Sequence, residues 1–141
     1  MNDTAIVARG YAEIVRAMQS AVVTLDGPMG SGKTTLAGLM IAELDPKIGS
    51  HSPTFSIINK HRAKIGGAYT DIYHMDLYRI RDESELDQLG LDEILTGRNI
   101  VFIEWPNRLG KRHLDLFKNR HVKIEINPHG DVRRFKLYGF K

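Results

Sequence analysis

One stretch of the chain decides its fold: Leu25-Asp-Gly-Pro-Met-Gly-Ser-Gly-Lys-Thr-Thr-Leu36. It matches the phosphate-binding pattern G-x-x-x-x-G-K-[ST], which is a glycine-rich loop between a strand and a helix. The fixed positions of the pattern are filled by Gly27, Gly32, Lys33 and Thr34. The stretch therefore predicts a P-loop, unless a glycine-rich turn satisfies the pattern by chance.

The flanking sequence supplies the context that such a loop requires. Residues 21–25 are apolar and mostly β-branched, which is typical of a buried strand. After the loop, apolar residues recur at helical spacing from Leu36 to Leu44, and Pro46 ends the segment. The order strand, loop, helix favours the P-loop over a chance match.

The spacing also has a chemical reason. Glycines allow successive backbone N–H groups to point at phosphate oxygens, and the helix N-terminus adds free donors and a positive dipole end. Lys33 would reach the β- and γ-phosphates of a nucleotide, and the Thr34 hydroxyl would bind Mg²⁺. The sequence thus predicts that ATP and Mg²⁺ are the ligands.

Length and composition limit the class of protein. The 141 residues suffice for a single domain, 1–141, with its own core. The absence of cysteine excludes disulfides and suits a reducing cytoplasm. No apolar run approaches the roughly 20 residues that span a bilayer, so we expect no membrane association.

Charge is divided unevenly along the chain. Residues 1–97 hold 9 Lys/Arg against 13 Asp/Glu, whereas residues 98–141 hold 11 against 4. The basic C-terminal part could touch RNA phosphates or an acidic partner, or it could be an ordinary solvated surface. No aromatic-rich RNA-binding motif accompanies it, and nothing in the sequence indicates DNA as a partner.

The remaining pattern predicts an α/β protein. We expect an amphipathic helix over 5–18, strands over 55–60 and 68–77 joined across Gly66-Gly67 as an edge hairpin, and a helical stretch from Asp82 that is interrupted at Gly90. Residues 99–103 form a short apolar run typical of a central parallel strand.

Two carboxylates stand at the ends of predicted strands. Asp76 stands out at the end of a predicted strand, because aspartate is a poor strand former. Either it has a functional role, or it serves structurally as a cap or in an ion pair with Arg79. Glu104 follows the central strand in the Walker-B arrangement, aimed at Mg²⁺ or its water. The next residue, Trp105, suits packing better than chemistry.

Two further segments contribute candidates. The polar loop 49–55 follows the P-loop helix, where related proteins often carry a switch that senses the γ-phosphate. Its candidates are Thr54 and Ser52, although a structural turn explains them equally well. Near the C-terminus, alternating residues predict an antiparallel pair at a sheet edge, with Arg133 on the same face as Phe135, directed inward or toward the ligand.

Four motifs in this order resemble the TsaE family (formerly YjeE), small bacterial P-loop ATPases required for threonylcarbamoyladenosine in tRNA. The motifs are the P-loop, Ser52-Pro-Thr-Phe55, His74-Met-Asp-Leu-Tyr-Arg79 and Ile103-Glu-Trp-Pro106. The last three are much more specific than the P-loop, and the resemblance covers nearly the whole chain.

The resemblance implies roles for particular residues. Thr34 and Glu104 would hold Mg²⁺, Asp76 would assist at the metal or at the attacking water, Thr54 would act as the switch, and Arg133 would lie near the base. The other motif residues of interest are Ser52, His74, Tyr78, Arg79 and Trp105. The phosphates would be held by Met29, Gly30, Ser31, Gly32, Lys33, Thr34 and Thr35.

The resemblance also implies partners. TsaE-like proteins hydrolyse ATP weakly alone and act with a TsaB–TsaD pair, so tRNA would be met indirectly or weakly, through the basic C-terminal part. The expected fold is a P-loop NTPase-like three-layer sandwich, with a mostly parallel central sheet and antiparallel edge strands.

Catalysis would depend on Lys33, Asp76 and Glu104, with either carboxylate orienting the water. Slow turnover by the protein alone is expected, since no arginine finger is obvious near the P-loop; Arg79 could serve as one in cis.

Two alternative functions remain. One is a nucleotide-gated binding module without catalysis. The other is a small-molecule kinase, which would need an arginine-bearing lid, and no such cluster is evident between the P-loop and Glu104.

Overall fold

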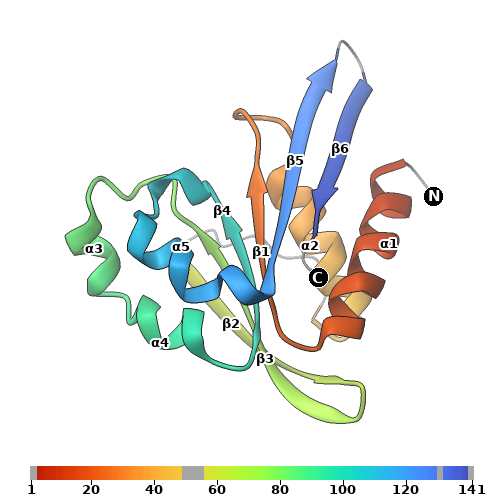
Figure 1. Cartoon of the computed structure of the whole chain (residues 1–141). Coiled ribbons are helices and arrows are strands. Elements are labelled where there is room, and N and C mark those ends of the chain that lie inside the picture. The colour runs from red at the N-terminus through yellow and green to blue at the C-terminus, as the bar shows by residue number, and fades with distance from the viewer. Residues whose placement is uncertain (1–2, 49–55, 130–131, 140–141) are drawn as a thin grey trace.

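The computed structural model describes residues 3–48, 56–129 and 132–139. Helices and strands are interspersed along the chain, with two strands in succession at β2–β3 and at β5–β6 and two helices at α3–α4 (Figure 1). The helices are α1 Asp3–Met18, α2 Lys33–Leu44, α3 Glu83–Asp87, α4 Leu91–Thr96 and α5 Lys111–Phe117, with short 3₁₀ turns at Pro106–Arg108 and Lys118–Arg120. The strands are β1 Ala21–Asp26, β2 Ile58–Ile65, β3 Ala68–Asp76, β4 Ile100–Glu104, β5 His121–His129 and β6 Val132–Tyr138.

The six strands form one sheet in the order β2-β3-β4-β1-β5-β6. The four inner strands are parallel: β3 pairs with β4, β4 with β1, and β1 with β5. The outer strands β2 and β6 run antiparallel to their neighbours. The expected α/β architecture, with a mostly parallel centre and antiparallel edges, is confirmed.

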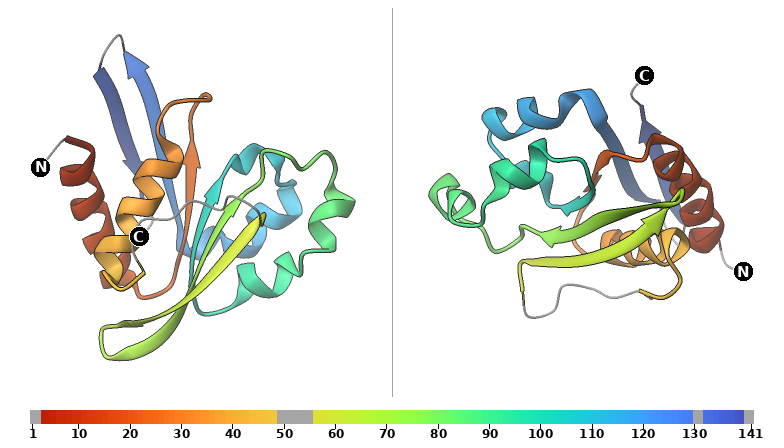
Figure 2. Two further views of the ribbon diagram at one scale, coloured as in Figure 1. Left: turned by 180° about the vertical axis from the view of Figure 1, so that it is seen from behind. Right: turned by 90° about the horizontal axis from the view of Figure 1, so that it is seen from below.

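Helices cover both faces of the sheet (Figure 2). Alternation along β1 and β4 explains why both faces are apolar, because successive side chains of a strand point in opposite directions. Val23 and Phe102 pack on the face beneath α1 and α2. Val22 and Val101 pack on the other face with α3, α4 and α5. The central strands are therefore buried on both sides, which produces three layers.

The predicted helix over 5–18 is α1, and its buried positions are Ala8, Ala12 and Val15. These small side chains let α1 pack closely beside α2. The break predicted at Gly90 is also confirmed: Gly90 has φ 69°, a left-handed conformation that separates α3 from α4.

One predicted strand boundary was wrong, and one helix was missed. The first hairpin strand was expected over 55–60 but runs over Ile58–Ile65, because the positive φ angles at Gly66 and Gly67 make a tight turn that pairs Ile65 with Ala68. The antiparallel pair predicted at a sheet edge is confirmed as β5 and β6; β6 is the edge strand, and β5 also pairs in parallel with β1. Helix α5 was not predicted at all.

Candidate functional site

The site lies where the parallel strands β1, β3 and β4 end. Asp76 and Glu104 are register partners across β3 and β4, and Leu25 is the partner of Glu104 across β4 and β1. The loop after β1 leads directly into α2, so the C-terminal ends of these strands and the N-terminus of α2 lie along the same side of the sheet. Ligands of open α/β sheets bind at this edge.

The loop before α2 has the backbone of a phosphate cradle. Gly30 (φ 78°) and Gly32 (φ 102°) adopt left-handed conformations that favour glycine. Gly32 precedes the first turn of α2 without any side-chain cap, so the N–H groups of that turn are free to bind an anion. The hydroxyl of Ser31 is buried and has no partner among the described residues, which suits an incoming phosphate oxygen.

Gly27 is required for a different reason. A Cβ at this position would lie 2.7 Å from the Ile126 carbonyl oxygen of β5 and 2.7 Å from the Ser31 hydroxyl oxygen. The start of the loop is thus pressed against the neighbouring strand, and only glycine fits there.

Lys33 is buried, with its side chain folded back along the loop. Its ammonium group donates to the carbonyl oxygens of Gly27 (2.6 Å) and Pro28 (3.0 Å) and lies 4.0 Å from the centre of the Trp105 ring. Burial lowers its pKa, while nearby carboxylates, with Glu104 first, oppose that shift. A buried cation in this place is stabilised further by anionic phosphates.

Glu104 is the centre of a buried hydrogen-bond chain. Its Oε1 accepts from the Thr34 hydroxyl at 2.5 Å, and its Oε2 lies 2.7 Å from Nε2 of His74. A carboxylate oxygen accepts, so the proton of this second contact is carried by His74 Nε2. The carboxylate of Glu104 and the hydroxyl of Thr34 are hard oxygen donors of the kind that Mg²⁺ prefers, and their proximity fits the ion.

Asp76 ends β3 beside Glu104 and is only partly buried. Its Oδ1 accepts from the Tyr78 backbone N–H at 3.0 Å, as the cap alternative predicted. Among the described residues it makes no ion pair with Arg79. One carboxylate oxygen is held in place by the turn, and the other has no hydrogen bond among the described residues.

Trp105 adopts φ 61°, a left-handed conformation that is rare for a large side chain and costs about 1–3 kcal/mol. Its ring stacks on Tyr78, with centroids 5.1 Å apart and an angle of 28° between the planes. The conformation holds the Trp105 ring beside the Lys33 ammonium group, so its packing, predicted from sequence, occurs at the site itself.

Arg133 reaches the loop from β6. A Cβ on Gly32 would lie 3.6 Å from Cζ of Arg133, so the guanidinium group covers the loop next to the α2 N-terminus. The side chain is exposed rather than directed into the core with Phe135. The structure therefore brings Arg133 to the loop, and its contact with a base stays a prediction.

The matching family model is described as "Threonylcarbamoyl adenosine biosynthesis protein TsaE", and it matches residues 1–135. The chain belongs to the TsaE family. It is similar to the tRNA threonylcarbamoyladenosine biosynthesis protein TsaE of Mycobacterium tuberculosis, with 38% identity over 79% of this chain and 68% of that protein. It is also similar to the proteins of the same name from Bacillus subtilis (35%; 80% and 65%) and Haemophilus influenzae (28%; 90% and 77%).

The TsaE-family motifs are placed unequally by the structure. His74, Asp76, Trp105 and Glu104 gather at the strand ends with Lys33 and Thr34. Ser52 and Thr54 lie outside the described residues. Met29 is 65% exposed at the loop, and Thr35 is exposed on α2. No helix among the described segments has the length and apolar content needed to cross a membrane.

Sequence reasoning missed Asp26 as a neighbour of Lys33. Asp26 ends β1, and its carboxylate opposes the pKa shift of Lys33. The available signal was its position, an acidic residue at the end of a buried strand directly before Gly27. The reasoning also missed an arginine cluster: Arg79 and Arg81 line one hollow together with Arg108.

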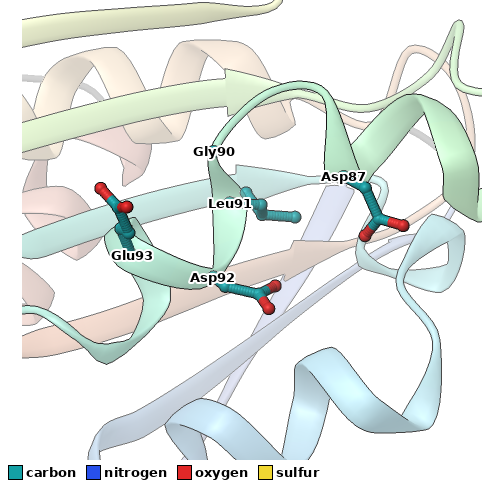
Figure 3. A pocket seen from close by; sticks show the side chains of 5 residues that line it. All are labelled: Asp87, Gly90, Leu91, Asp92 and Glu93. Atoms are coloured by element: carbon teal, nitrogen blue, oxygen red, sulfur yellow. The ribbon is translucent and has the colours of Figure 1, made fainter.

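A second hollow of about 310 Å³ lies at α4, away from the loop (Figure 3). Its Asp87 and Asp92 come close to the buried His113, an arrangement with three possible metal ligands. Arg112 already pairs with both carboxylates, at 2.9 and 2.7 Å, so the structure uses this cluster to tie α5 to α3 and α4.

Proposed function

We propose that this TsaE-family chain is a Mg²⁺-dependent ATPase that supports formation of threonylcarbamoyladenosine in tRNA, together with a TsaB–TsaD-type complex. The observation that carries the proposal is the hydrogen-bonded group Thr34–Glu104–His74, which lies beside the buried Lys33 at the end of the P-loop. It unites a phosphate-binding cation with hard oxygen donors for a metal. The pathway is supported by the family and by the printed names of the relatives.

Each residue has a part in this reaction. Backbone N–H groups from Gly30 to Thr35 bind the phosphates, and the buried Lys33 ammonium group neutralises charge on the transferred phosphoryl group. Thr34 and Glu104 would hold Mg²⁺, which supplies Lewis-acid stabilisation of the phosphate oxygens.

The attacking water needs a carboxylate acceptor. Asp76 is suited to that role because one of its oxygens is fixed by the Tyr78 N–H while the other is available. Glu104 remains the alternative, with both its oxygens already engaged. The Trp105 ring, which stacks on Tyr78, covers one side of the Lys33 ammonium group.

The test is a reconstituted tRNA-modification reaction. Its conditions resemble those of the cytoplasm, where we expect the protein to act. The reaction contains a purified TsaB–TsaD pair, threonylcarbamoyl adenylate, tRNA, ATP and Mg²⁺, and phosphate release is followed in parallel. We compare the wild-type chain with Lys33→Ala and Glu104→Gln. Gln keeps the size of the buried Glu104 side chain, and thermal unfolding of each variant separates a loss of activity from a loss of fold. Lys47→Ala, on the exposed segment after α2, is the control.

If multiple turnovers need the wild-type chain and fail with both variants, the ATPase proposal stands. Full modification with Glu104→Gln but no phosphate release would instead favour a nucleotide-gated module. Transfer of labelled γ-phosphate to a small hydroxyl compound would favour a kinase.

A further inference from the structure

A hollow of about 500 Å³ lies beside the nucleotide site and is lined almost entirely by cationic and aromatic side chains. Two segments form it. The first follows β3 and supplies Tyr78, Arg79, Ile80 and Arg81, and the second is the 3₁₀ turn after β4, which supplies Arg108. Both segments continue from the strand ends that carry Asp76 and Glu104. The hollow therefore adjoins the predicted catalytic edge.

The three arginine side chains of this hollow have no carboxylate partner among the described residues. Arg79, Arg81 and Arg108 are all exposed, and none forms an ion pair among residues 3–48, 56–129 and 132–139. Acidic residues follow Arg81 directly and lie at the border of the hollow, with the Glu83 carboxylate against Gly110. Asp82 accepts from the Ser84 N–H as the cap of α3, and Glu85 accepts from the Arg81 backbone N–H.

The wall of the hollow also offers an aromatic surface. Tyr78 is 42% exposed and is backed by the Trp105 ring, whose contact with Lys33 connects the hollow to the P-loop. Arginine guanidinium groups bind phosphate oxygens in pairs of hydrogen bonds and stack on bases, and tyrosine stacks on unpaired bases. An acidic peptide would use the charges but not the aromatic wall.

We propose that this hollow is an RNA-binding site, in which Arg81 and Arg108 contact backbone phosphates of tRNA and Tyr78 contacts a nucleoside. The inference adds a direct tRNA contact to the proposed function and rests on it for the choice of tRNA. It differs from the expectation that the basic C-terminal part as a whole meets tRNA weakly. Of the three arginines, only Arg108 belongs to that part.

The experiment measures binding of a fluorescently labelled tRNA transcript to the full chain by anisotropy, at several salt concentrations. The test variant is Arg81→Gln/Arg108→Gln. The control is Lys47→Gln/Arg98→Gln, which removes the same charge from two exposed positions. Lys47 follows α2 and Arg98 precedes β4, so both lie at the end of the sheet opposite the P-loop. ATP binding by every variant is measured in parallel.

We expect the test variant to bind tRNA about tenfold to fiftyfold more weakly at 0.1 M salt. The reason is that each lost phosphate contact reduces the magnitude of the negative slope of log K against log salt by about 0.7–0.9. Its ATP binding should match that of the wild type. The control should lose less than about threefold in tRNA affinity. Restoring charge with Arg81→Lys/Arg108→Lys should recover most of the salt slope.

Equal losses in the test and control variants would overturn the inference, since they would show a diffuse charge effect. Loss of labelled poly-glutamate binding with tRNA binding unchanged would also overturn it and indicate an acidic protein partner. A wild-type chain that binds ATP but not tRNA refutes the RNA site and leaves the proposed function standing. Failure to bind ATP refutes the proposed function instead.

Discussion

The buried contact between His74 and Glu104 makes a quantitative prediction about stability. Both side chains are almost fully buried, at 1% and 2% exposure, and their nearest atoms are 2.7 Å apart. His74→Phe keeps a ring of similar size but removes the donor, which leaves one buried carboxylate oxygen unpaired. A hydrogen bond to a charged group contributes about 1.5–3 kcal/mol, and breaking a buried pair costs up to about 3–5.

We therefore expect His74→Phe to lower the free energy of unfolding by about 2–4 kcal/mol. For a chain of this size that corresponds to a fall in Tm of about 5–15 °C, or a shift of about 1–2 M in the urea midpoint. The assay is equilibrium urea unfolding, monitored by circular dichroism without nucleotide or Mg²⁺.

The matched control is His74→Gln, whose amide nitrogen can take the place of the donor Nε2; it should lose less than half as much. In a Glu104→Gln background, His74→Phe should cost about 1–2 kcal/mol less, because the unpaired group is then neutral. A change of under about 0.5 kcal/mol for His74→Phe, or an equal cost in both backgrounds, would refute the reasoning.

Three further predictions concern other parts of the molecule. Gly27→Ala should destabilise the chain by about 1–3 kcal/mol and weaken ATP binding, because its Cβ would meet the Ile126 carbonyl oxygen at 2.7 Å; Gly10→Ala, with open space around its Cβ, is the control for thermal unfolding. Arg133→Gln should weaken ATP binding several-fold in calorimetry, since its guanidinium group covers Gly32, whereas the neighbouring Arg134→Gln should not. Burial lowers the pKa of His121, whose Nε2 contacts the Thr24 hydroxyl at 2.7 Å, so the folded state keeps it neutral while the unfolded chain protonates it below about pH 6.5. The stability that comes from this neutral form is present above pH 6.5 and is lost as pH falls toward the folded pKa. The free energy of unfolding of His121→Gln should therefore fall less between pH 7 and pH 5 than that of the wild type.

Local patterns in the sequence determined the P-loop, the helix after it and the strand before it. Each depends on residues close together in the chain, such as the glycines that permit positive φ and the lysine that follows them. A continuous apolar run predicted β4. A strand buried on both faces needs apolar residues at successive positions, and in β4 only the last residue, Glu104, is polar. The boundary errors at β2 arose because an edge strand, half solvated, carries a weaker apolar signal than a central one.

Tertiary structure alone decided which distant residues meet. The strand order places β3 beside β4, and this register brings His74 and Asp76 to Glu104. The parallel pairing of β5 with β1 lets β6 carry Arg133 back over the loop. Likewise, Arg81 and Arg108 share a hollow because the ends of β3 and β4 are neighbours. Such contacts depend on pairing between segments far apart in sequence, which no local periodicity encodes, so the motifs could be named from the sequence but their assembly could not.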